Sequence, residues 1–175
     1  MKAGLKIAIS GKSGCGNSTV SRIVAERLEF EMINFTFRQL SEEKGMKFGD
    51  MCEASMTDYS FDRELDRRQV EMASAGNCVL GSRLAVWMLG DADLKVFLNA
   101  STETRAGRIH QREGGEIADV VDETRKRDSN DSARYNSIYE INNNDFGFVD
   151  LVIKADRLSQ YQIADIIVAA AKSIE

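Results

Sequence analysis

The chain has 175 residues, and its 43% hydrophobic and 29% charged residues are typical of a single globular domain and argue against disorder. The net charge of −5 gives the surface no general attraction for DNA or RNA, and no apolar run approaches the roughly 18 residues that a membrane span needs. The three cysteines lack a C-x-x-C spacing, which predicts reduced thiols and a cytoplasmic protein. The single histidine, His110, argues against Ser-His-Asp hydrolysis and against a multi-histidine metal site.

Strands and helices alternate along the chain, as the spacing of its apolar residues indicates. The alternation predicts an α/β fold in three layers, a parallel sheet covered on both faces by helices, and such sheets bind ligands at the carboxyl ends of their strands. The last helix is expected to carry Ile163, Ile166, Ile167 and Ala170 on one face. In chain order the expected elements are a strand at 5–10, a helix at 18–28, a short strand at 31–34, helices at 36–45 and 61–75, a strand at 78–82, an apolar segment at 83–89 that could open a helix, a strand at 94–100, helices at 102–112 and 117–136, a strand at 149–153 and a helix at 160–173.

A glycine-rich loop follows the first expected strand directly and leads into a helix. Gly11, Gly16 and Ser18 match the pattern G-x-x-x-x-G-K-[ST] of a phosphate-binding loop. Glycines let backbone N–H groups approach phosphate oxygens closely, and the helix N-terminus adds partial positive charge. The sequence therefore predicts a polyphosphate site, with the Ser18 hydroxyl placed to ligate Mg²⁺. The residues expected to bind the nucleotide are Gly11, Lys12, Ser13, Gly14, Cys15, Gly16, Asn17, Ser18 and Thr19.

Asn17 stands where this pattern has its lysine, so the loop lacks the usual positive charge on the β- and γ-phosphates. One hypothesis is that Lys12 folds its ammonium group back over the same phosphates. The alternative is that Lys12 is a solvated loop residue, and the sequence leaves both open.

Arginines outside the loop form two groups at helical spacing. Arg105, Arg108 and Arg112 share one helix face, and Arg127, Asp131 and Arg134 share another. Because a guanidinium group binds phosphate through a planar, permanently charged fork, we interpret these helices as a lid that closes over a phosphoryl group, with the Gly114–Gly115 pair as its flexible tip. The alternative is a solvated helix face with internal ion pairs.

Several runs, in order and spacing, resemble those of the cytidylate kinases, in the short form typical of archaea and also found in some bacteria. The resemblance covers nearly the whole chain. Its motifs are F-R at Phe37-Arg38, E-K-G-M at Glu43–Met46, D-R-E-L-D-R-R-Q at Asp62–Gln69, R-L-A-x-W-M at Arg83–Met88, D-L-K-V-F-L at Asp93–Leu98, R-A-x-R-I at Arg105–Ile109 and the R-x-x-x-x-x-x-R-Y run at Arg127–Tyr135.

The resemblance implies a P-loop kinase that transfers a phosphoryl group from ATP to CMP or dCMP with Mg²⁺. It implies one domain, 1–175, with a core at about 1–34, 76–109 and 137–175, a monophosphate-binding insertion at about 35–75 and a lid at about 110–136. It also implies small-molecule substrates only, no nucleic acid or membrane partner, and a monomer or weak homo-oligomer. By motif, Arg38 and Arg83 would grip the CMP phosphate, and Arg127 and Arg134 would lie along the transferring group with Asp131 near the acceptor. Asp62 and Asp66 would be candidates for the nucleoside pocket. Lys12 is a catalytic candidate only on the separate hypothesis given above.

Two positions depart from the pattern of that family. Asn17 replaces the loop lysine, and Gly81 stands where the family usually has an acidic residue at the end of a strand. The segment 32–36 also lacks the family's run of small residues. Two alternatives therefore stay open: a P-loop phosphotransferase with another small acceptor, such as UMP, AMP, shikimate or dephospho-coenzyme A, and a kinase homologue that binds nucleotides with weak turnover.

Overall fold

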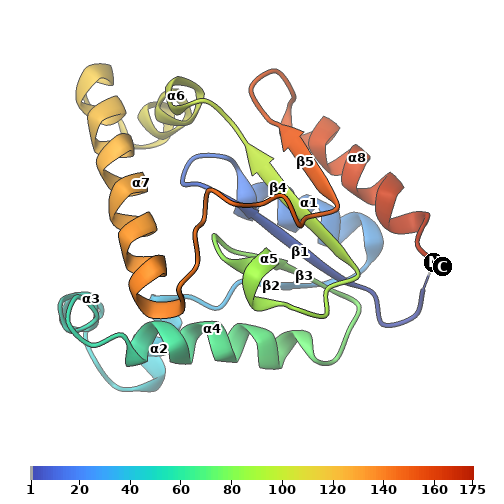
Figure 1. Cartoon of the computed structure of the whole chain (residues 1–175), viewed down its shortest axis with the longest axis horizontal. Helices are drawn as coiled ribbons and strands as arrows, with labels where there is room; N and C mark the ends of the chain where they lie inside the picture. Colours follow the sequence, from blue (N-terminus) through green and yellow to red (C-terminus); the bar gives the residue numbers. More distant parts are fainter. Residues whose placement is uncertain (1) are drawn as a thin grey trace.

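Five parallel strands form one sheet in the computed structural model, which describes residues 2–175 (Figure 1). The strand order is β2-β3-β1-β4-β5, so the predicted α/β fold with a parallel sheet is confirmed. The strands are β1 (Lys6–Gly11), β2 (Glu31–Ile33), β3 (Cys78–Gly81), β4 (Leu94–Asn99) and β5 (Leu151–Lys154). The helices are α1 (Asn17–Leu28), α2 (Phe37–Glu43), α3 (Phe48–Ala54), α4 (Ser60–Ala73), α5 (Ala85–Met88), α6 (Thr102–Glu113), α7 (Ile117–Tyr139) and α8 (Gln160–Lys172).

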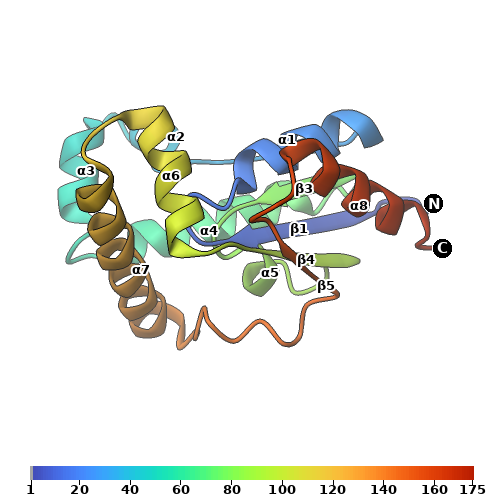
Figure 2. The same ribbon diagram turned by 90° about the horizontal axis from the view of Figure 1, so that it is seen from above.

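The central strand β1 is buried on both faces, as its continuous apolar run predicts. Ile7 and Ile9 point into the larger core beneath α1 and α8, while Ala8 points into the core shared with α5. Figure 2 shows α1 and α8 on one side of the sheet and α5 on the other. The two cores hold the sheet rigid, so the loop that follows β1 starts from a fixed position.

Two groups of helices lie beyond the carboxyl ends of the strands, at the end of the sheet opposite the chain termini (Figures 1 and 2). The segment α2–α4 has a small core of its own around Phe35, Leu40 and Met51. Helices α6 and α7 pack together through Ala106, Ile109 and Val120. These helices enclose the ligand-binding edge of the sheet, and each group has a small hydrophobic core of its own.

Two local expectations differ from the structure. Helix α3 was not predicted, because its seven residues bury only Met51 and show no apolar period. The prediction for Ile166 was wrong: it is 42% exposed, and the buried face of α8 carries Ala164 and Ala171 beside Ile163 and Ile167. The buried face of α8 packs against α1, and Ile166 lies outside that face. Within residues 2–175, no helix has the length and hydropathy that a bilayer crossing requires.

Candidate active site

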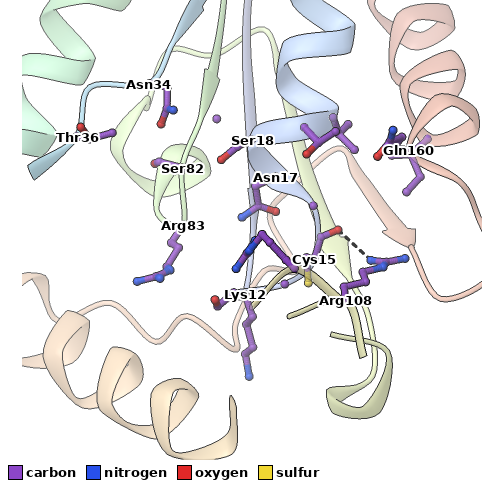
Figure 3. Close-up of a pocket in the computed structure, with 18 of the residues that line it drawn as sticks. Lys12, Cys15, Asn17, Ser18, Asn34, Thr36, Ser82, Arg83, Arg108 and Gln160 are labelled. Carbon is purple, nitrogen blue, oxygen red and sulfur yellow. Dashed lines mark hydrogen bonds between the residues drawn. The ribbon is translucent and has the colours of Figure 1, made fainter. Parts of the chain in front are cut away.

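A cavity of about 850 Å³ opens at the carboxyl end of the parallel strands (Figure 3). The glycine-rich loop between β1 and α1 lines its centre. Asn34, Thr36 and Arg83 lie on one flank, and Arg108 and Gln160 lie on the other. Because ligand pockets commonly enclose about 300–1,000 Å³, the space is large enough for one ligand group on each side of the loop.

Glycines allow the sharp turn of the loop. Gly14 and Gly16 have φ angles of +83° and +99°, which L side chains rarely adopt. A Cβ on Gly14 would lie 2.9 Å from the Cβ and the carbonyl oxygen of Arg105, so the loop rests directly on α6. Gly16 is the N-cap of α1 and caps no N–H group with a side chain. The first N–H groups of α1 are therefore available to an anion.

Two arginines of α6 bind backbone carbonyl groups of the loop. Arg105 donates to the carbonyl oxygen of Ser13 at 3.0 Å, and Arg108 donates to that of Cys15 at 3.2 Å (Figure 3). The Arg105 side chain is only 3% exposed, and its other N–H groups bind Asp128, Thr102 and the carbonyl group of Ala100. Arg105 therefore supports the loop and has no donor left for a substrate, whereas Arg108 and Arg112 both line the cavity.

Asn17 closes the loop upon itself. Its side-chain amide donates to the carbonyl oxygen of Gly11 at 2.5 Å, and its Oδ1 is buried without a partner. The Lys12 side chain points away from Ser18, and its Nζ lies 4.0 Å from Asp128 Oδ2 on α7 (Figure 3). The loop's one cation thus lies on the α7 side of the cavity, and its contact with phosphate stays a prediction.

Gly81 ends β3 where α1 packs against the strand. A Cβ at this position would lie 2.6 Å from Ser21 Cβ and closer still to Ser21 Oγ. A carboxylate therefore does not fit here unless α1 moves. The next residue, Ser82, lines the cavity with Ser18, and its Oγ is buried without a hydrogen-bond partner.

The hydroxyl groups of Ser18 and Ser82 are the protein groups that could bind Mg²⁺ in this site. Within residues 2–175 no group of three or more His, Cys, Asp or Glu side chains is placed to hold a metal ion. Mg²⁺ prefers oxygen ligands and is often held by few protein groups together with substrate phosphates and waters. Ser18 Oγ and the unpartnered Ser82 Oγ fit that donor set, so these two residues would hold the ion beside bound phosphates.

Arg83 and Arg127 line the cavity from two different elements. Arg83, after β3, lies 3.3 Å from Asp131 of α7, and Arg127 donates to Ser13 Oγ at 3.2 Å. Burial raises the pKa of Asp131, and the nearby Arg83 opposes that shift. Helix α7 thus brings one cation to the loop and one carboxylate to the opposite flank.

Asp62 and Asp66, predicted for the nucleoside pocket, lie at the interface between α4 and α7, outside the residues that line the cavity. Arg134, predicted to lie along the transferring phosphoryl group, lies there too. Arg134 binds both carboxylate oxygens of Asp62, at 2.5 and 3.0 Å, and donates to the carbonyl oxygen of Ser55 at 2.7 Å. Tyr139 donates to Asp66 at 2.5 Å, and burial raises the pKa of Asp66 to about 6. Arg134 and Asp62 neutralise each other here, and Asp66 accepts a hydrogen bond from Tyr139. The nucleoside contacts of Asp62 and Asp66 and the role of Arg134 at the transferring group stay predictions.

Sequence reasoning placed Arg38 at the acceptor phosphate and overlooked Asp128. Arg38 is exposed, and its guanidinium group lies 4.5 Å from the centre of the Phe48 ring, so its predicted role is not tested. Asp128 binds Arg105 through both oxygens, at 2.6 and 3.0 Å. Its position three residues before Asp131 on α7 was the one available signal that it faces the site.

Known proteins resemble this chain in sequence and in fold. The cytidylate kinase-like family matches residues 6–157. The chain is 42% identical to cytidylate kinase 2 of Borreliella afzelii, covering 93% of this chain and 94% of that protein, and 35% identical to the cytidylate kinase of Pyrococcus horikoshii, covering 98% and 90%. Among solved structures, a shikimate kinase from Acinetobacter baumannii in complex with shikimate has a TM-score of 0.66 at 15% identity, covering 99% of this chain and 97% of that one. That last likeness concerns the fold alone.

Proposed function

Because the chain belongs to the cytidylate kinase-like family, we propose that it transfers the γ-phosphoryl group of ATP to CMP or dCMP, giving ADP and CDP or dCDP. One observation carries this proposal beyond family membership. A single cavity joins the phosphate loop to a separate cationic flank at Arg83, so a donor and an anionic acceptor can lie in one space. Because the two polyanionic substrates repel each other, their alignment requires separate positive groups for the donor and for the acceptor.

The donor half of the site is the loop 11–19. Its glycines and the uncapped first turn of α1 supply N–H groups to the ATP phosphates. Ser18, with Ser82 beside it in the cavity, would hold Mg²⁺, which supplies charge neutralisation on the phosphates when bound. Arg112 and Tyr161 line the far flank and offer planar surfaces to the base.

The acceptor half is the flank formed by Asn34, Thr36 and Arg83, bordered by the insertion 35–75. Arg83 binds the CMP phosphate, and Arg38 joins it when its side chain leaves Phe48. Asp62 and Asp66 are our candidates for the nucleoside, with Asp131 near the acceptor. Arg134, which binds Asp62 in this structure, would lie with Arg127 along the transferring phosphoryl group. Residues 110–136 are the proposed lid, and it carries Arg127 to the cavity.

Arg127 and Lys12 stabilise the charge that develops on the moving phosphoryl group. An arginine in this role is worth about 10³–10⁵ in rate. The acceptor phosphate is already a nucleophile at neutral pH, so none of the titratable side chains needs to act as a general base. The chain's contribution is therefore alignment of the two substrates, neutralisation of their charge and exclusion of water.

Turnover with a panel of acceptors tests the proposal. The purified full chain is given ATP and Mg²⁺ with CMP, dCMP, UMP, AMP, shikimate or dephospho-coenzyme A, and ADP release is followed by a coupled assay. The expected result is the highest kcat/KM with CMP or dCMP. Binding of ATP without CMP-stimulated ADP release, or preference for another acceptor, would contradict it.

We also propose that the protein acts in the cytoplasm on small molecules, as a monomer or weak homo-oligomer. The free thiols of Cys15, Cys52 and Cys78 support a reducing compartment. Sedimentation analysis of the purified protein measures the oligomeric state.

A further inference from the structure

We propose that Asp128 is a positioning residue, which aims Lys12 at the gap that the phosphoryl group crosses. This inference rests on the proposed function. Asp128 is not among the residues that line the main cavity, but its carboxylate lies beside Lys12, the one charged side chain of the loop.

The first observation is the place of the Lys12 ammonium group. Lys12 Nζ lies 4.0 Å from Asp128 Oδ2, the one carboxylate within that distance of it in residues 2–175. Lys12 and Arg83 both line the main cavity, and both line a small recess together with Asp128 and Asp131. Lys12 and the cation of the acceptor flank thus border the same two spaces.

The second observation is that the Asp128 carboxylate is a fixed anchor. Its side chain is 16% exposed, and both oxygens bind the buried guanidinium group of Arg105. The same guanidinium group holds the carbonyl oxygen of Ser13, the residue after Lys12. Asp128 thus contacts the Lys12 ammonium group directly and holds the backbone beside Lys12 through Arg105.

The third observation concerns charge. Arg105 already compensates Asp128 in a buried, bidentate ion pair. The contact with Lys12 is longer, and the Lys12 side chain is 30% exposed, so it adds little to stability. Its consequence is directional, because a lysine side chain is flexible and its ammonium group needs an anchor to occupy one place. Asp131 does not serve, since the ion pair of Lys12 within 4.0 Å is with Asp128, whereas that of Asp131 is with Arg83.

A double-mutant cycle tests this role through kcat. Asp128→Asn removes the anchor's charge, Lys12→Met removes the ammonium group, and the double variant removes both. We expect Asp128→Asn to lower kcat by about 10- to 100-fold, the range that a small misplacement costs, with KM for ATP and CMP within about twofold of wild type. In the Lys12→Met background, Asp128→Asn is expected to lower kcat no further.

Stability is measured on the same variants, because Asp128→Asn also weakens the pairing of Arg105. The melting temperature is expected to fall equally in the presence and absence of Lys12, since that loss arises from Arg105 alone. Asp128→Glu keeps the charge for Arg105 but displaces the carboxylate by a methylene group, and it repeats the cycle if Asp128→Asn does not fold. Asp165→Asn, the same charge change at a 68% exposed position of α8 outside the proposed lid, is the control and leaves kcat unchanged.

Two outcomes would overturn the proposal, and they are distinguishable. If wild type is active and the Asp128 substitutions lower kcat by the same factor with Met at position 12, Asp128 acts without Lys12 and the positioning role is wrong. If wild type transfers no phosphoryl group to any acceptor, the proposed function fails and takes this inference with it.

Discussion

Gly81→Ala is a sharp test of how α1 packs on the sheet. The substituted Cβ would lie 2.6 Å from Ser21 Cβ and nearer still to its hydroxyl oxygen, and both belong to a fully buried residue of α1. Gly81 is not among the residues with positive φ, so alanine causes no backbone strain and the cost is steric. Overpacking of this kind typically costs about 1–3 kcal/mol. At about 2–4 °C per kcal/mol for a chain of this size, the melting temperature should fall by about 2–12 °C.

The assay is thermal and urea unfolding of four proteins: wild type, Gly81→Ala, Ser21→Gly and the double variant. Ser21→Gly removes both overlapping atoms, at a cost of about 1 kcal/mol for glycine in a helix. Gly81→Ala should then cost almost nothing in that background. The close packing of α1 on β3 would be refuted if Gly81→Ala were as stable as wild type, or if its cost were the same with and without the Ser21 side chain.

Three further predictions concern charged groups. Arg105→Met should lower the free energy of unfolding by about 3–5 kcal/mol in urea titrations, because it leaves the largely buried Asp128 carboxylate with only its longer contact to Lys12. A loss below about 1 kcal/mol would contradict the support role of Arg105. Burial raises the pKa of Asp66 to about 6 in the folded protein, from the ordinary 3.8 of an aspartate, so the folded state binds the proton more tightly. The contribution of this group to stability is present at low pH and is lost as pH rises from about 4 to 6. The free energy of unfolding should fall by about 3 kcal/mol over this pH range, and Asp66→Asn should abolish the fall. If the free energy of unfolding changes with pH in the same way in both proteins, the pKa of Asp66 is ordinary. Arg127→Ala should lower kcat by about 10³-fold with the melting temperature unchanged, and a decrease below about tenfold in single-turnover measurements would remove it from the transferring group.

The parts that were predictable from sequence are those set by neighbouring residues. A short apolar strand, three closely spaced glycines and an amphipathic helix follow one another within 6–28, and each signal is local. The structure forms β1, the loop and α1 there. The strand order β2-β3-β1-β4-β5 depends on contacts between distant segments, and the apolar patterns of the single strands do not contain it.

The candidate site was predictable in residue type more than in role. Arg105 belongs to a helical arginine group that suggests phosphate contacts, yet it is buried against Asp128, 23 residues further along the chain. Whether an arginine faces substrate or braces a loop is decided by its partner on another helix. In the same way, the absence of an acidic residue at Gly81 suggested a change in the chemistry of the site. The structure shows a steric reason instead, because Ser21 leaves no room for a side chain there.

Transfer of an isotopic label examines the central claim most directly. The full chain is incubated with ATP labelled in its γ-phosphate, CMP and Mg²⁺, and the nucleotides are separated. The account predicts label in the β-phosphate of CDP, with an equal amount of unlabelled ADP. Label that stays in ATP, or that is released only as inorganic phosphate, would contradict it.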